Sequence, residues 1–176
     1  MAFAGYHGAA IERAADAMVV AGRSCGSCSL CCKAVPIDKP PKSAGVWCVH
    51  HRAGKGCTIR ATRPIICRAF YCGWMLTAEL GEEWKPDISK FVLVWDGRSS
   101  LIAYVDPDDP SAWKREPYYG VLKKWSTRAH VAIHVREQLT VILPDRDVEL
   151  GVINLGDQVV YSKSGNKISV ALKRKG

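Results

Sequence analysis

Long uncharged apolar runs are absent from this chain of 176 residues. No segment approaches the roughly 18 consecutive apolar residues that a membrane-spanning helix requires, so no membrane span is expected. The first twenty residues also lack the basic start of a secretory signal, and Glu12 and Asp16 interrupt their apolar positions. We therefore expect a cytoplasmic protein with no membrane partner, whose N-terminal segment forms an amphipathic helix over about residues 3–21.

Cysteine is absent from the last 104 residues, although the chain contains eight. All eight lie between positions 25 and 72, so they belong to one local site and not to the whole fold. A chain of this length can bury a hydrophobic core that is stable without disulfide bonds, so its size does not require them. In a reducing compartment, clustered cysteines more often bind metal or carry out redox chemistry.

Acidic residues are nearly absent from the same segment. Between Arg23 and Gly73, nine Lys and Arg residues accompany a single acid, Asp38, whereas elsewhere 16 basic residues balance 16 acidic ones. The whole excess charge of +8 therefore lies near the cysteines. Cations lower thiol pKa values and balance the charge of metal-bound thiolates, so compensation at the site is the favoured explanation. An acidic or nucleic-acid partner is the alternative.

Composition divides the chain into two parts. Residues 1–74 contain the N-terminal helix and the cysteine-rich segment, whose loops, such as 39–45, are rich in Gly and Pro. Such a segment buries little apolar surface alone, and metal bonds would supply the missing folding free energy. Residues 75–176 are rich in strand-like runs. We expect both parts to belong to one globular unit.

Hairpin signals separate several of these runs and favour an antiparallel sheet. One helix is expected over about residues 111–128. The predicted fold class is α+β, with a metal-binding N-terminal part packed on a mainly antiparallel C-terminal sheet. The strand-like runs are 91–95, 100–105, 130–135, 139–143, 148–153, 158–163 and 167–172.

The first cysteines, Cys25, Cys28 and Cys31, recur every three residues. A C-x2-C loop turns back on itself, and Gly26 leaves that turn unobstructed, so both sulfurs can reach one metal. Three ligands in this register are typical of a loop around an iron–sulfur cubane, whereas structural zinc more often takes two separated C-x2-C pairs. The spacing leans slightly toward an iron–sulfur cluster and leaves zinc open.

Cys32 directly follows Cys31, and adjacent side chains of an extended chain point in nearly opposite directions. One cysteine can thus face a first metal while the other faces a second centre. Eight thiols suffice for two four-thiolate sites, and the doublet would then lie between the two sites. The alternative for Cys32 is a buried apolar thiol.

Two histidines, His50 and His51, lie between Cys48 and Cys57 and are candidate nitrogen ligands. Exposed loop histidines are the favoured interpretation, because the eight thiols already suffice for two metal sites.

The last two cysteines surround a predicted short helix, which begins at about Pro64, carries Cys67 and ends just before Cys72. Arg63 and Arg68 are placed to donate hydrogen bonds to sulfur or to pair with an acid. Nearby aromatic residues either screen the site from water or, as we favour, belong to the ordinary core: Phe70, Tyr71 and Trp74.

Residues 25–74 resemble the bacterial CxxCxxCC proteins, a family described as zinc- or iron-chelating. The matching motifs are CGSCSLCC at 25–32, Cys48, and GCTIRATRPIICRAFYCGW at 56–74. They are also similar to a motif of the flagellin lysine N-methylases, for which an iron–sulfur cluster is implied. The resemblance implies metal ligation by Cys25, Cys28, Cys31, Cys32, Cys48, Cys57, Cys67 and Cys72. It implies nothing for the region after Trp74.

The favoured function is a metal-binding protein that holds zinc or an iron–sulfur cluster, with two centres if the thiols divide equally, and that meets a protein partner. A cluster-dependent enzyme, methyltransferase-like or redox, is the alternative, although no glycine-rich strand-to-helix loop marks a nucleotide-type cofactor site. A metal-scaffolded nucleic-acid module and a thiol–disulfide protein are less favoured. His130 and His134 share one face of a predicted strand and are interpreted as polar side chains of a solvated face.

Overall fold

The computed structural model describes residues 8–38, 41–96, 99–154, 156–165 and 167–175. Its N-terminal half consists of short elements: α1 (Gly8–Asp16), α2 (Cys31–Ala34), β1 (His51–Arg52), β2 (Gly56–Cys57), η1 (Arg60–Thr62), α3 (Ile65–Arg68), α4 (Gly73–Leu76), η2 (Glu82–Trp84) and α5 (Pro86–Ser89). The C-terminal half contains β3 (Phe91–Trp95), β4 (Ser100–Val105), η3 (Ala112–Lys114), α6 (Tyr118–Ser126), β5 (His130–Val135), β6 (Gln138–Ile142), β7 (Asp147–Val152), β8 (Gln158–Ser164) and β9 (Lys167–Lys173). Among the described residues, no helix is both long and apolar enough to cross a membrane.

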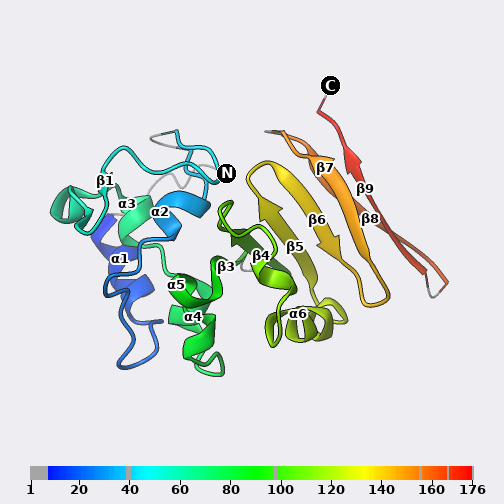
Figure 1. Cartoon of the computed structure of the whole chain (residues 1–176), viewed down its shortest axis with the longest axis horizontal. Coiled ribbons are helices and arrows are strands. Elements are labelled where there is room, and N and C mark those ends of the chain that lie inside the picture. Colours follow the sequence, from blue (N-terminus) through cyan, green and yellow to red (C-terminus); the bar gives the residue numbers. More distant parts are fainter. Residues whose placement is uncertain (1–7, 39–40, 97–98, 155, 166, 176) are drawn as a thin grey trace.

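Strands β3 to β7 form a five-stranded sheet in sequential order (Figure 1). Neighbouring strands run antiparallel except β4 and β5, which pair in parallel. A parallel pair needs a long crossover connection, and the segment with η3 and α6 supplies it. The predicted α+β class with a mainly antiparallel sheet is confirmed.

The two longer predicted helices, over 3–21 and 111–128, are shorter than the sequence suggested, and the short one after Pro64 ends already at Arg68. The segment 111–128 divides into η3 and α6, because Pro117 has no N–H to donate and its ring does not fit a helix interior, so α6 begins only after it. The N-terminal helix α1 ends at Asp16, and the N–H of Val20 donates instead to the carbonyl of Met75 at 2.9 Å. The predicted positions 3–7 lie outside the described residues.

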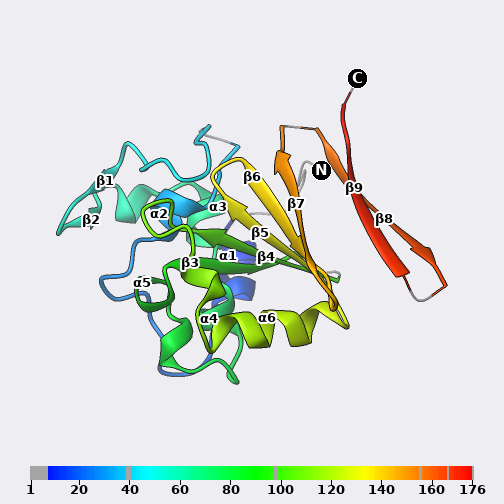
Figure 2. The same cartoon turned by 45° about the vertical axis from the view of Figure 1, so that its right-hand side comes forward.

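The sheet has an apolar core on each face. On one face, Phe91 and Leu93 of β3 join the main core, together with residues of α4 and α6. On the other face, Val92 packs against Leu30 and Ala34 of the cysteine-rich segment. Alternate residues of a strand point to opposite faces, so β3 connects the two cores. Figure 2 shows α6 beneath the sheet and α2 at its upper end. The cysteine-rich part is therefore packed directly on the sheet.

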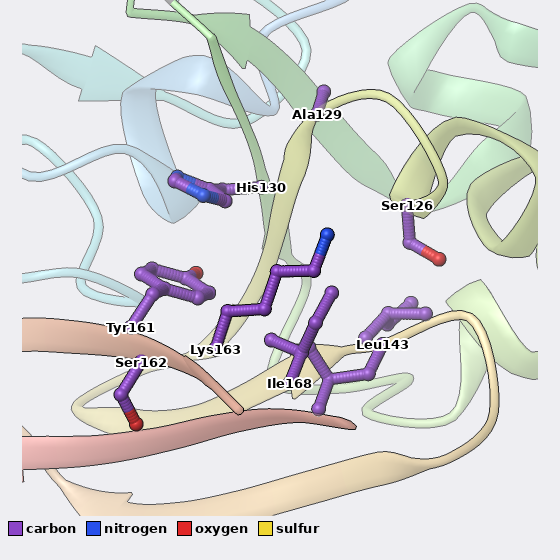
Figure 3. A pocket seen from close by; sticks show the side chains of 9 residues that line it. Ser126, Ala129, His130, Leu143, Tyr161, Ser162, Lys163 and Ile168 are labelled. Atoms are coloured by element: carbon purple, nitrogen blue, oxygen red, sulfur yellow. The ribbon is translucent and has the colours of Figure 1, made fainter. Parts of the chain in front are cut away.

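Strands β8 and β9 form a separate antiparallel hairpin beside β7 (Figure 1). The imidazole of His130 stacks on the ring of Tyr161 with 3.8 Å between centroids, and Arg146 Nη2 donates to the carbonyl of Ile168 at 2.6 Å. A cavity of about 210 Å³ lies between the hairpin and the sheet. Figure 3 shows the Lys163 side chain reaching into it. Just past β9, Arg174 Nη1 also donates to the carbonyl of Val152 in β7 at 2.7 Å, so the hairpin is held to the sheet at more than one place.

The two strand histidines differ in environment. His130 is exposed, as predicted, apart from its stacking partner. His134 is partly buried with its ring centroid 5.2 Å from that of Tyr104, and burial lowers its pKa to about 4. The solvated-face interpretation is therefore wrong for His134, because the cysteine-rich part covers the neighbouring strands on that face.

Candidate metal centre

All eight cysteines are free thiols and line a single cavity of about 220 Å³ in the N-terminal half. Seven are partly buried, and Cys25 is exposed. His50, Arg63 and Lys85 are the charged or titratable residues of the wall besides the thiols. The rest of the wall is apolar: Val35, Pro36, Ile37, Ile59, Pro64, Ile66, Phe70, Trp74, Met75 and Pro86. Thiols that are far apart in the sequence thus line one cavity whose remaining wall is largely apolar.

The first cysteines are positioned by a tight turn followed by α2. The N–H of Cys28 donates to the carbonyl of Cys25 at 2.9 Å, and Gly26 between them has a φ of 54°. That left-handed backbone is accessible to glycine at little cost. The N–H of Cys32 donates to the carbonyl of Ser29 at 2.9 Å, so the next turn leads directly into α2.

The doublet lies in a helix and not in extended chain, which corrects the expectation that its side chains point in opposite directions. Successive residues of an α-helix are rotated by about 100°. Both Cys31 and Cys32 therefore reach the same cavity. The hydrogen bond between them raises the pKa of Cys31 well above its ordinary value and lowers the pKa of Cys32 to about 7.

Three of the later cysteines come from different parts of the chain: Cys48 from a loop, Cys57 from β2 and Cys67 from α3. The N–H of Cys48 donates to the carbonyl of Cys32 at 2.9 Å, which holds the loop around Cys48 against α2. Cys57 pairs with His51 across β1 and β2. Cys67 lies in α3, as the sequence predicts, with its N–H bonded to the carbonyl of Pro64 at 2.9 Å.

Cys72 immediately precedes α4, which lies very close to β3. A Cβ atom at Gly73 would lie 2.8 Å from the Cβ of Leu93, closer than real Cβ atoms approach one another. Glycine at position 73 therefore permits the approach of α4 to β3, and that approach places Cys72 at the cavity.

The first set of thiols whose charges act on one another comprises Cys25, Cys28, Cys31 and Cys72. Burial, and after it the charges of Cys25 and Cys28, raises the pKa of Cys72 to about 11. The same two cysteines raise the pKa of Cys31, after the stronger effects of its bond to Cys32 and of burial. The fourth thiolate for the C-x2-C-x2-C run is thus available from Cys72.

The second set comprises Cys32, Cys48, Cys57 and Cys67. Burial raises the pKa of Cys67, and the charges of Cys32, Cys48 and Cys57 act in the same direction. The two sets meet at the bonded pair in α2. The charges of the thiols thus act mainly within these two sets, and the hydrogen bond between Cys31 and Cys32 links the sets.

Two cations lie among the second set. Burial lowers the pKa of Lys42, although the charges of Cys48, Cys32, Cys31 and Cys67 oppose the shift. The Lys42 ammonium also donates to three backbone carbonyls, at 3.0, 3.1 and 3.1 Å. Arg63 lowers the pKa of Cys32 and opposes the rise at Cys67. Sequence reasoning did not single out Lys42, for which the only signal was its place in the acid-poor stretch.

The two candidate histidine ligands separate in the structure. His50 lines the cavity with the thiols. His51 stacks on Trp47, with ring centroids 4.0 Å apart, and shares a 3.1 Å hydrogen bond with the hydroxyl of Ser29. Only His50 is therefore in a position to act on whatever the cavity holds.

The remaining predicted neighbours divide between the cavity and the core. Phe70 and Trp74 line the cavity, while Tyr71 packs against the main core and donates to a carboxylate oxygen of Asp16. Arg68 pairs with a carboxylate of α1, Glu12, at 3.5 Å, which is the second of its two predicted roles. The favoured interpretation as ordinary core is confirmed, since Trp74 is buried in the main core and Phe70 packs on the second core; both also screen the thiols.

Lys33 attaches the thiol doublet to the sheet. Its side chain is 6% exposed, and its ammonium contacts carboxylate oxygens of Asp106 at 2.6 Å and of Asp108 at 2.5 Å. Burial lowers the pKa of Lys33, but the hydrogen bonds and charges of the two carboxylates outweigh it and raise the pKa above its ordinary value. The ion pair fixes α2 just beyond the end of β4.

Within the described residues, no three His, Cys, Asp or Glu side chains gather closely enough to hold a single metal ion. The thiols instead line a common cavity.

No protein-family model, no curated protein and no solved structure matches this chain.

Proposed function

We propose that this chain is a metal-binding protein whose eight cysteines hold metal at two adjacent four-thiolate sites. The observation that carries the proposal is the single cavity lined by all eight thiols, which divide into two sets that meet at Cys31 and Cys32. The thiolate-rich donor set suits zinc or iron–sulfur clusters. The resemblance of residues 25–74 to a zinc- or iron-chelating family points to the same class of protein.

The size of the cavity supports iron–sulfur clusters over zinc. A tetrahedral zinc ion lies about 2.3 Å from each sulfur, which places the four sulfurs about 3.8 Å from one another and leaves no space inside. An iron–sulfur cluster contains several irons and inorganic sulfides, so its thiolate ligands lie around a cluster that is larger than a single zinc ion. The eight thiols here line a cavity of about 220 Å³ together with thirteen other residues, most of them apolar. Two zinc sites are the alternative.

Purification without oxygen, followed by absorption spectroscopy and analysis of iron, zinc and acid-labile sulfide, tests the proposal. Clusters are expected to give a brown protein with broad visible absorption and with iron and sulfide in equal amounts. A colourless protein with about two zinc ions per chain would select tetrahedral zinc sites. A well-folded, fully reduced protein that contains neither metal, and takes up neither, would contradict metal binding altogether.

A cluster-dependent enzyme is the second candidate, because His50 places an acid–base group on the wall of the same cavity. An imidazole can accept and donate protons beside a metal centre. The His50→Gln variant should keep its metal if His50 serves catalysis and not ligation. Loss of metal from this variant would instead make His50 a ligand.

A further inference from the structure

The basic residues of the cysteine-rich segment have separate roles in the structure. Lys42 and Arg63 act on the thiols. Lys33 and Arg68 pair with carboxylates, and Arg23 donates to backbone carbonyls of the segment after Trp74. Compensation of thiolate charge therefore accounts for only part of the local excess of positive charge.

Three cations of this segment remain without a carboxylate partner. Arg52, Lys55 and Arg60 are exposed, and among the residues that the structure describes no carboxylate forms an ion pair with them. Arg52 Nη1 only donates to two neighbouring backbone carbonyls, at 2.9 Å each. None of the three is among the main causes of the pKa shifts of Cys28, Cys31, Cys32, Cys67 and Cys72. Lys39, the ninth basic residue, lies outside the described residues.

The three cations lie on consecutive elements beside exposed apolar side chains. Arg52 is in β1, Lys55 in the turn to β2 and Arg60 in η1. Val49 is 74% exposed and its carbonyl oxygen accepts a hydrogen bond from Arg52 Nη1, and Ile66 is 49% exposed on the nearby α3. We call these five residues the basic rim. In Figures 1 and 2, β1 lies at the outer end of the molecule, away from the sheet.

We propose that the basic rim is a docking surface for an acidic protein partner. Uncompensated positive charge attracts a partner of opposite charge and orients it during encounter. Val49, which is bonded to Arg52 through its carbonyl, and Ile66 of α3 are exposed apolar side chains that a protein partner would bury. Since Ile66 also lines the thiol cavity, the bound partner would lie beside the proposed metal centre.

The same residues fit a nucleic acid less well. Proteins that bind DNA through its backbone commonly neutralise about 6–10 phosphates, and the rim offers only three free cations. Trp47, the exposed aromatic ring nearest in sequence, already stacks on His51 and has the Lys33 ammonium 5.5 Å from its ring centroid. It is therefore not free to stack on a base.

The test uses the full chain with its metal content verified, and fluorescence anisotropy with a labelled peptide that alternates Glu with Leu. Wild-type protein should bind this peptide, more weakly as salt rises, and should not bind a matched peptide with Lys in place of Glu. The triple variant Arg52→Glu, Lys55→Glu, Arg60→Glu should bind roughly tenfold more weakly, since three exposed ion pairs of ordinary strength amount to about that factor.

A matched control reverses three exposed cations elsewhere, in Lys124→Glu, Arg128→Glu, Lys173→Glu. It has the same net charge as the rim variant, so it should keep wild-type binding if the position of the charges matters. Equal weakening in both variants, or no binding of the acidic peptide at low salt, would overturn the proposal. So would tighter binding of single-stranded DNA or of phosphatidylserine vesicles.

The Val49→Ser variant separates docking from charge attraction alone. A protein partner that buries this side chain should bind this variant more weakly while the salt dependence stays the same. An unchanged affinity would indicate that only charge acts, and would refute a protein docking surface. The metal content of each variant, measured in the same samples, keeps these outcomes separate from those of the proposed metal sites.

Discussion

The Lys33→Met substitution is expected to destabilise the protein by about 3 kcal/mol, because it removes one partner of a buried ion pair. Methionine keeps most of the side-chain volume and its apolar contacts. What it removes is the ammonium group that contacts Asp106 at 2.6 Å and Asp108 at 2.5 Å. The perturbation is therefore almost purely one of charge and hydrogen bonding.

The two carboxylates differ in what they lose. The side chain of Asp106 is 16% exposed, so without Lys33 its charge would remain largely out of water. Removing one partner of a buried pair costs about 3–5 kcal/mol, and the lower end applies because Asp106 keeps a 3.1 Å bond from the N–H of Asp108. The side chain of Asp108 is 78% exposed, so Asp108→Asn should cost less than about 1 kcal/mol.

Guanidinium unfolding without oxygen, followed by tryptophan fluorescence, measures the difference between these two variants at equal metal content. Lys33→Met should also release metal to a chelator faster than Asp108→Asn, because α2 carries both cysteines of the doublet. The reasoning fails if Lys33→Met costs no more than Asp108→Asn, or if the two variants lose metal at the same rate.

Three further predictions concern single side chains. The pKa of His134 is about 4 in the fold and 6.5 in the unfolded chain, so the unfolded chain takes up the proton first as the pH falls. Stability present above pH 6.5 should therefore fall toward pH 4 by up to about 3 kcal/mol, and His134→Gln should flatten that slope in denaturant titrations. Cys28→Ser should reduce bound metal and loosen the N-terminal half, and full metal content in elemental analysis would exclude Cys28 as a ligand. Gly73→Ala should destabilise the fold in thermal unfolding, since the added Cβ would lie 2.8 Å from that of Leu93; an unchanged midpoint would show that α4 can move away from β3.

The strands were the most predictable part of the fold. The runs 91–95, 100–105 and 130–135 coincide with β3, β4 and β5, because each is a short run rich in apolar, strand-forming residues. The parallel pairing of β4 with β5 was not predicted, although a helix between two strands is typical of such a crossover. Hairpin signals elsewhere were given more weight than that one long connection.

The site was predictable in its members but not in its arrangement. The local density of cysteines indicated one site, and the structure brings all eight thiols to one cavity. Which thiols neighbour one another depends on long-range packing, since Cys72 reaches the first set only through the contact between α4 and β3. Sequence spacing contains no information about that contact. The helical backbone of the doublet was missed because four residues are too few to show a helical period.

The helical doublet has a consequence for metal loading. If the first set binds metal through Cys31, the turn of α2 becomes fixed, and Cys32 is then held in place for the second set. The second site no longer has to lose that conformational freedom on binding, so its affinity should rise. Titration of metal into apoprotein, followed by native mass spectrometry, should therefore show mainly empty and fully loaded chains. A half-loaded species that dominates at half saturation would mean that the two sets fill independently, and that the doublet does not couple them.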